Sequence, residues 1–255
     1  MTRITALAVS TVREAVRDKV LHSILFFAGI LLLVSLAMQE ITIGDSAKVV
    51  RGVALGGISL FGGVIAIFLG VGLVYKEIER KTIYTLASKP MPRWQILLGK
   101  YLGLWMTLFL EIAFLTVLYT VILGAQQGAP SPQIYLSIAM LMGELTLLTA
   151  WATLFSTFAS PMMASAYSMA VYFIGHFCDD IKRFGDASDN PQFQSIANVL
   201  YRVLPNLEVF NIRDAAVHGI AVPMSEVAWA YAYGLGYTVV VLAVAMAVFE
   251  RRDFK

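Results

Sequence analysis

Six long apolar stretches dominate the pattern of the chain, and charged residues, proline or clusters of small polar residues bound each of them. A helix needs about 20 mostly apolar residues to cross the hydrocarbon core of a bilayer. The fifth stretch is short, and Pro161 just before it predicts a turn or a kink, because proline breaks the helical hydrogen-bond ladder. We predict an all-α polytopic membrane protein with six transmembrane helices, at Leu21–Met38, Gly52–Tyr75, Leu97–Gly124, Ile134–Phe158, Met162–Cys178 and Val227–Phe249.

The composition of the 255 residues agrees with this pattern. Hydrophobic residues make up 58% of the chain and charged residues only 14%, whereas soluble domains carry about 25% charged residues. The mean hydropathy is +0.74. The single cysteine gives no basis for a disulfide framework or a cysteine-rich metal site, and a net charge of +2 gives no reason to expect a nucleic-acid partner.

The distribution of lysine and arginine predicts the orientation. If the N-terminus is cytoplasmic, 13 of the 19 basic residues lie on the cytoplasmic side or at the cytoplasmic helix ends. Cytoplasmic loops of membrane proteins carry such an excess. We therefore expect a multi-pass protein of the cell (inner, cytoplasmic) membrane with both termini in the cytoplasm.

Residues 1–22 are amphipathic at helical spacing. Basic and acidic residues share one side of the expected helix, and the apolar face consists of Ile4, Leu7, Ala8, Val12, Ala15, Val16 and Val20. A basic amphipathic helix next to a membrane span is typical of a helix that lies on the membrane surface. The alternative is a plain cytoplasmic extension of the first span.

Residues 76–94 form the most charged stretch of the chain, and Pro90 and Pro92 end any helix before the next span. A short charged helix at this place is suited to contact a soluble partner. The residues that we select for such a contact are Glu77, Glu79, Arg80, Lys81, Thr82 and Tyr84. A solvated loop is the equally favoured alternative.

The external stretch 179–226 is too long for a plain turn. It begins with polar residues, and then apolar residues recur at helical spacing between Phe193 and Leu204. We expect a helix here, which either enters the outer leaflet or forms a small extracellular cap.

Glu111 and Glu144 are acidic residues near the middle of predicted spans. A carboxylate at this depth is costly, so we expect it to be protonated or hydrogen bonded across helices. If the third and fourth spans are neighbours, the two residues form a pair that shares a proton. They are either polar residues of a transport path or interhelical contacts that never meet cargo, and hydrogen bonds of the second kind are common.

Small residues repeat at four-residue spacing in two runs of the second span, first Gly52 and Gly56, then Gly62, Ala66 and Gly70. Such a stripe lets helix backbones approach closely and indicates a helix–helix contact, within the subunit or across a dimer.

A second cluster lies at the outer end of the fifth span, where His176, Cys178, Asp179 and Asp180 follow one another closely. If the helix continues, its geometry brings His176 beside both aspartates. An ordinary helix end is the favoured interpretation, and we predict no metal site.

Three segments carry a family resemblance: "TVREAVRDKVLHSILFF" before the first span, "KEIERKTIYTLASKPMPRWQILLGKYLG" after the second, and "LPNLEVFNIRD" before the sixth. Together they resemble the permease subunits of ABC-2-type, exporter-like ABC transporters, in particular small six-span permeases related to that of nitrous-oxide-reductase maturation. The best match is the loop pattern formed by Glu77, Glu79, Thr82, Ser88, Lys89, Pro90, Arg93, Leu98, Gly99 and Lys100.

The resemblance implies a type V exporter-like fold. Residues 1–22 would be the elbow helix, residues 21–255 the six-span permease domain, and Glu77 to Ser88 would include the coupling helix that contacts the ATP-binding subunit. Short re-entrant outer helices would match Phe193 to Phe210. Two permease copies, or this chain and a paralogue, would meet across a two-fold axis, and ATP and Mg²⁺ would be bound by the partner ATPase, so that this chain needs no cofactor of its own.

The sequence lacks the motifs of several enzyme classes. It contains no G-x-x-x-x-G-K-[ST] phosphate loop, no H-E-x-x-H and no G-x-S-x-G. We expect a permease without catalytic residues, driven by a cytoplasmic ATP-binding cassette subunit. The alternatives are a proton-coupled secondary transporter that uses Glu111 and Glu144, for which we find no inverted repeats, and a membrane scaffold that transports nothing.

Overall fold

A computed structural model describes the chain except residues 1–2, 42–44, 80–91, 128–129 and 252–255. All elements of the described residues are helical, as predicted. They are α1 (Arg3–Ala15), α2 (Lys19–Ile41), α3 (Ser46–Glu79), α5 (Arg93–Gln127), α6 (Pro132–Phe158), α7 (Pro161–His176), α8 (Cys178–Ala187), α9 (Pro191–Val203), the 3₁₀ helix η1 (Glu208–Phe210), α10 (Arg213–His218) and α11 (Met224–Arg251).

Four stretches of these helices are long and apolar enough to cross a membrane: Ser46–Gly72, Arg93–Gly124, Pro132–Phe158 and Met224–Arg251. They coincide with the second, third, fourth and sixth predicted spans. The first predicted span falls on α2, which contains the shorter apolar stretch Leu21–Ser35. The fifth falls on α7, which has 16 residues. The polytopic fold is thus observed, and six crossings stay a prediction.

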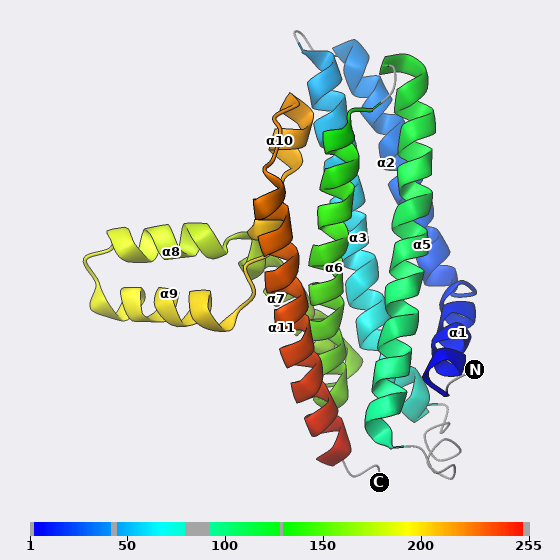
Figure 1. The fold of residues 1–255 in the computed structure, drawn as a ribbon, viewed down its shortest axis with the longest axis vertical. Helices are drawn as coiled ribbons and strands as arrows, with labels where there is room; N and C mark the ends of the chain where they lie inside the picture. Colours follow the sequence, from blue (N-terminus) through cyan, green and yellow to red (C-terminus); the bar gives the residue numbers. More distant parts are fainter. Residues whose placement is uncertain (1–2, 42–44, 80–91, 128–129, 252–255) are drawn as a thin grey trace.

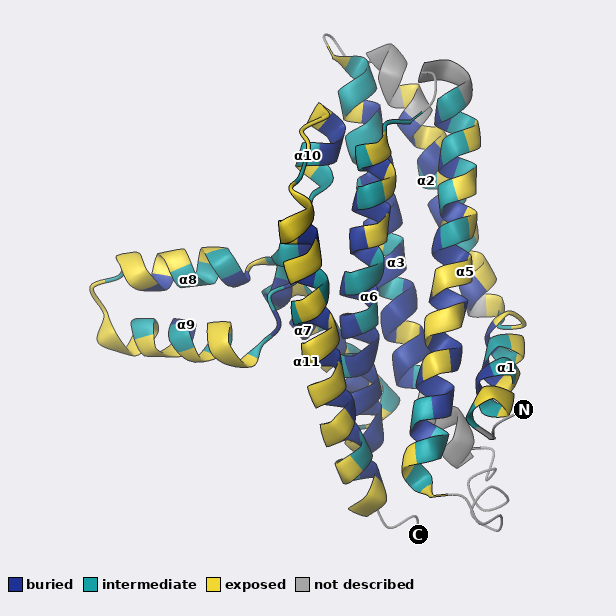
Figure 2. Ribbon diagram, in the orientation of Figure 1, coloured by how far each residue is buried: buried dark blue, intermediate teal, exposed yellow. Residues whose placement is uncertain are grey.

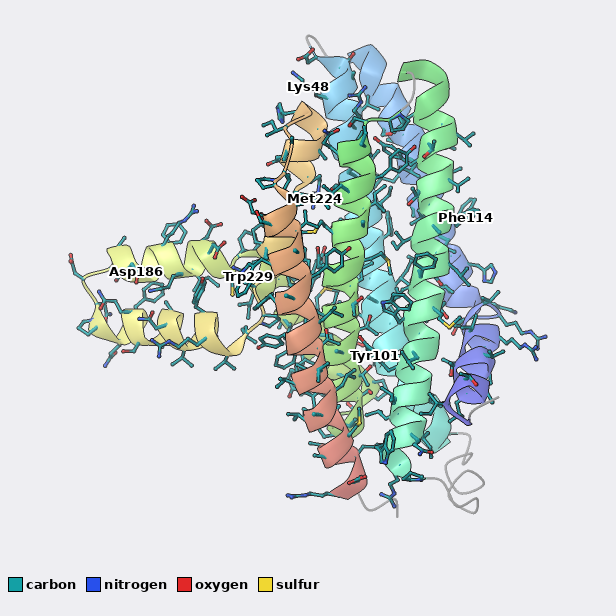
Figure 3. The ribbon with its side chains drawn as sticks, viewed as in Figure 1. Lys48, Tyr101, Phe114, Asp186, Met224 and Trp229 are labelled. Carbon is teal, nitrogen blue, oxygen red and sulfur yellow. The ribbon has the colours of Figure 1, made fainter. Side chains whose placement is uncertain are left out.

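The helices form an elongated bundle with α3 and α6 at its centre, and α8 and α9 project sideways from it (Figure 1). Buried residues concentrate on the inner faces of α3 and α6, whereas α5 and α11 expose much of their outer surface (Figure 2). That surface is apolar, with Phe114 and Trp229 among the exposed side chains (Figure 3). A continuous exposed apolar surface of this kind fits contact with lipid.

Small residues bring the central helices together. A Cβ atom added to Gly70 would lie 2.5 Å from the Cβ atom of Ala152 on α6, and one added to Gly62 would lie 3.1 Å from the Leu145 side chain, also on α6. Ala66, between the two glycines, is fully buried. This part of the stripe therefore faces a helix of the same subunit.

The other predicted packing glycines have different surroundings. A Cβ atom on Gly56 would lie 3.3 Å from the Arg213 guanidinium group, and one on Gly52 would have no neighbour within 4 Å. The stripe of five residues is thus not one continuous contact face.

The N-terminal helix α1 is shorter than the predicted range 1–22, because it ends at Ala15 and Lys19 already begins α2. It lies along the lower part of α5 (Figure 1). Its buried face consists of Ala8, Thr11 and Ala15. A Cβ atom on Gly103 of α5 would lie 2.7 Å from the Ala8 carbonyl oxygen, so the two helix backbones approach closely.

The external segment is more helical than its sequence predicts. The polar residues after the fifth span form α8, and the apolar periodicity forms α9, whose N-cap Asn190 accepts a hydrogen bond from the backbone of Gln192 at 3.0 Å. Lys182 on α8 donates to Asn198 on α9 at 2.9 Å, which joins the two helices as a hairpin. Asp186 on α8 lies well away from the bundle (Figure 3).

Candidate functional site

A buried polar cluster centres on Glu144 of α6. The Glu144 side chain is 3% exposed, and its Oε1 atom lies 3.4 Å from Nε2 of His176 at the end of α7. The other ring nitrogen of His176, Nδ1, lies 2.9 Å from the Tyr172 carbonyl oxygen one turn earlier. That contact orients the imidazole towards α6, so the carboxylate and the histidine form a polar contact between two helices of the bundle.

The cluster continues on its other side to α3 and α10. A small cavity of about 20 Å³ is lined by Glu144 together with Ser59, Ser137, Asn211 and Arg213. A cavity needs roughly 10–15 Å³ to hold one water molecule, so this space and its polar lining suit a buried water. The Arg213 guanidinium group lies 3.5 Å from the Ser59 hydroxyl. The cavity thus joins residues from α3, α6 and the segment before α11.

Glycines hold the segment 204–213 inside the bundle. The backbone N–H of Leu207 donates to the Gly175 carbonyl at 3.0 Å. Phe210 is 2% exposed, and its ring fills the space that Cβ atoms on Gly143 and Gly234 would need, at 2.7 and 2.6 Å. The outer segment is therefore packed between α6, α7 and α11, which places Asn211 and Arg213 at the cavity.

Glu111 is not part of this cluster. Its side chain is buried in α5, and neither carboxylate oxygen has a hydrogen-bond partner. The hydrogen-bonded pair with Glu144 that the sequence suggested is not formed, because Glu144 turns to His176 instead. A buried carboxylate without a partner carries a large desolvation cost in its charged form.

The cluster of His176, Cys178, Asp179 and Asp180 is also not formed. The helix breaks at Phe177, so His176 lies at the end of α7 and faces Glu144, while Asp179 on α8 accepts a hydrogen bond from Asn206 at 2.8 Å. In the part of the chain that the structure describes, no three His, Cys, Asp or Glu residues come close enough to hold a metal ion.

The predicted contact residues lie at the end of α3 and beyond it. Glu77 and Glu79 belong to the last turn of α3. Four more lie outside the described residues: Arg80, Lys81, Thr82 and Tyr84. After this segment α5 begins at Arg93, whose Nη1 atom donates to the carbonyl oxygens of Phe249 and Glu250 at 3.5 and 3.3 Å.

That contact of Arg93 ties the start of α5 to the end of α11. Arg93 belongs to the loop pattern, but no sequence signal pairs it with the last apolar stretch, which lies more than 150 residues further along the chain. Once the fold brings the two together, the cation is stabilised beside the C-terminal carbonyl groups of the helix.

Long apolar helices around a buried polar cluster define the chain as a multi-pass helical membrane protein. Residues 5–254 match the family described as ABC-2 family transporter protein, and the chain belongs to this family. It is therefore a membrane permease component of an ABC transporter. Membership of this family implies association with the bilayer and with an ATP-binding cassette partner. Among curated proteins, no sequence matches the chain. The narrower resemblance to permeases of nitrous-oxide-reductase maturation stays a prediction.

Proposed function

We propose that the chain forms one half of the membrane pathway of an ATP-driven exporter, and that residues 76–94 transmit the movements of a separate ATP-binding subunit. Family membership supports this assignment. The sequence contains no phosphate-loop motif, so we place ATP and Mg²⁺ binding on the partner, and we assign no cofactor to this chain.

The observation that carries the proposal is the way in which α3 and α5 continue from the segment 76–94 into the core. α3 has 34 residues and α5 has 35, without a break in either. α3 packs closely on α6 through Gly62 and Gly70, and Arg93 joins α5 to the end of α11. Because packed interiors transmit strain, a displacement of the segment reaches α6 and α11.

The orientation follows from the charges. One end of the bundle holds α1, the end of α3, the start of α5 and the end of α11 (Figure 1). The excess of basic residues assigns that end to the cytoplasm of the inner membrane. We further propose that two copies, or this chain and a paralogue, face each other across a two-fold axis and release cargo outward.

We also propose that the outer gate of this pathway includes the buried polar residues Glu144, His176 and Arg213. They join α6, α7 and the segment that leads to α11, so a rearrangement of these elements must break or re-form their contacts. An interhelical contact of purely structural value is the alternative. Replacing Glu144 by Gln keeps the size and a hydrogen-bonding side chain, and it distinguishes a lost transport cycle from lost folding.

The test is a reversal of charge in the segment. Glu79→Lys combined with Arg80→Glu should abolish the ATP hydrolysis that the permease stimulates in its ATP-binding subunit, while the helices stay folded. The matched control is the reversal of the exposed ion pair Arg183–Asp180 on α8 (Arg183→Asp with Asp180→Arg), which leaves coupling intact. Normal stimulation in the first variant would refute the role of the segment.

Capture of the ATP-binding subunit separates this function from its alternatives. A proton-coupled carrier or a scaffold works without such a subunit, whereas a permease of this kind binds it and loses it when the segment is altered. Circular dichroism and a monodisperse elution profile verify that each variant is folded.

A further inference from the structure

The hairpin of α8 and α9 carries an apolar face that is open to its surroundings. Ile196, Val199 and Val203 of α9 are between 57% and 59% exposed. They follow one another at spacings of three and four residues, so they share one side of the helix. The hairpin extends sideways from the bundle (Figure 1), and no other described element covers this side. We call these three residues the apolar face of α9.

The two helices of the hairpin meet through small and polar residues. A Cβ atom added to Gly185 of α8 would lie 2.5 Å from the Cβ atom of Ala197 on α9. Lys182 donates a hydrogen bond to Asn198 at 2.9 Å. These contacts define the side of α9 that is turned to α8. Because an α-helix turns by about 100° per residue, the apolar face lies on the opposite side of α9.

The side of α8 that is turned away from α9 is charged. Gly185 and Lys182 contact α9, so the same helical geometry places Asp180 and Arg183 on the opposite side. Their side chains are 54% and 81% exposed. Arg202, the charged residue of α9, lies on the flank of its helix, where a long side chain reaches water. The hairpin therefore has two layers, with an apolar outer surface on α9 and a charged outer surface on α8.

The two layers are stacked along the axis of the bundle. The hairpin runs across this axis, and α9 lies on the side of the chain termini while α8 lies on the other side (Figure 1). With the termini in the cytoplasm, the apolar face is turned to the interior of the bilayer and the charged side of α8 to the outside. An amphipathic helix in the membrane surface lies in this way, with its apolar side about 5–10 Å below the boundary of headgroups and acyl chains.

Aromatic residues of α11 lie at the same level. The Tyr237 hydroxyl donates to the Val203 carbonyl oxygen at 2.5 Å, and the Tyr233 hydroxyl accepts from the backbone N–H of Asn206 at 2.9 Å. Trp229, one turn before Tyr233, is 71% exposed and lies where the hairpin leaves the bundle (Figure 3). Tryptophan and tyrosine are enriched where helices cross the membrane surface. The apolar face thus continues the exposed apolar surface of α11 at a level that its aromatic residues assign to the interface.

We propose that the hairpin lies in the outer surface of the membrane, with the apolar face of α9 among lipid acyl chains and the charged side of α8 in water. Lipid is the partner, because a boundary between lipid and water requires layers stacked along the bundle axis, and a protein partner does not. The inference rests on the orientation in the proposed function. Whereas a re-entrant helix returns between the spans, this hairpin lies in the lipid beside them.

Spin labels on the two sides of the hairpin test this proposal. Val199→Cys and Arg183→Cys, each combined with Cys178→Ala, carry a nitroxide in phosphatidylcholine nanodiscs. Oxygen is concentrated in the hydrocarbon and a nickel chelate in water, so the ratio of their collision rates with the label reports its depth. The label at 199 should lie about 5–10 Å below the phosphates. The label at 183 is the matched control and should have a ratio several-fold lower.

Two results overturn the proposal. If the label at 199 collides with the nickel chelate as often as the label at 183, the hairpin stands in water as an extracellular cap. If the label at 199 collides rarely with both reagents, protein covers the apolar face, as in contact with a second copy of the chain.

A measurement on the unaltered chain decides the matter if the cysteine variants do not fold. Phosphatidylcholine with a diazirine in its acyl chain should label the tryptic peptide 184–202 at Ile196 and Val199. Leu235 and Val239 on the exposed side of α11 serve as the internal control. Labelling of α11 without labelling of the peptide contradicts the proposal. No ATP-binding subunit is present in these measurements, so their failure leaves the coupling role of the segment 76–94 untouched.

Discussion

Replacement of Gly103 by alanine tests the contact between α1 and α5. The new Cβ atom would lie 2.6 Å from the Cβ atom of Thr11 and 2.7 Å from the carbonyl oxygen of Ala8. Ordinary contacts begin at 3.4 Å, so α1 must move away by about 0.8 Å. Overpacking of this kind costs about 1–3 kcal/mol, and the better helix propensity of alanine offsets about 0.5–1 kcal/mol of it. We expect the docking of α1 to weaken by about 1–2 kcal/mol.

Hydrogen–deuterium exchange measures this effect, because local opening of α1 exposes its backbone amides. A loss of 1–2 kcal/mol raises the exchange rate of α1 about 5- to 30-fold. The matched control is Gly124→Ala in the same helix, where the added Cβ atom has no neighbour within 4 Å. If exchange of α1 is the same in the two variants, the close approach of α1 and α5 is wrong.

Three further predictions concern other contacts. Gly70→Ala should lower the free energy of unfolding by about 1–3 kcal/mol through its clash with α6, whereas Gly52→Ala, with open space around it, should not; equal melting temperatures in detergent would contradict this. Arg93→Ala should speed amide exchange in the last turn of α11 several-fold, because it removes the hydrogen bonds to the carbonyl oxygens of Phe249 and Glu250. Trp94→Ala is the control, and equal exchange rates in the two variants would exclude the contact. Burial raises the pKa of the Glu208 carboxyl group, a shift that its hydrogen bond from Asn211 opposes. The stability that Glu208 contributes is present below its unfolded pKa, near 4.3, and is lost as pH rises through the raised folded pKa; Glu208→Gln should remove this part of the pH dependence of the melting temperature, and an identical pH profile would contradict it.

The helices themselves follow from the sequence, because apolar runs bounded by charges and prolines set where a membrane helix can begin and end. α6 was expected from Ile134 to Phe158 and ends at Phe158. Pro161 begins α7, as the predicted turn requires. The helical periodicity between Phe193 and Leu204 likewise predicts α9, which ends at Val203.

The partners of the buried polar residues do not follow from the sequence. The sequence allows Glu144 to pair with Glu111 if the third and fourth spans are neighbours, but Glu144 contacts His176, which the break at Phe177 leaves at the end of α7. Periodicity within a segment says nothing about which distant helix lies opposite. The same holds for Gly143, whose missing side chain makes room for Phe210.

The surroundings of α1 show a similar limit. Amphipathicity predicts that one face of α1 avoids water, and both a membrane surface and another helix satisfy that requirement. The structure buries Ala8 and Thr11 against α5, where Gly103 leaves the space. Gly99 and Gly103 stand four residues apart in α5 and both face α1, but the spacing alone does not say which helix lies opposite.

The most direct measurement of the central claim is ATP turnover by purified components in nanodiscs. The permease alone should hydrolyse no ATP, its ATP-binding subunit alone should hydrolyse little, and the two together should show hydrolysis that depends on the segment 76–94. Transport of solute by the permease in vesicles without any nucleotide-hydrolysing subunit would contradict the account.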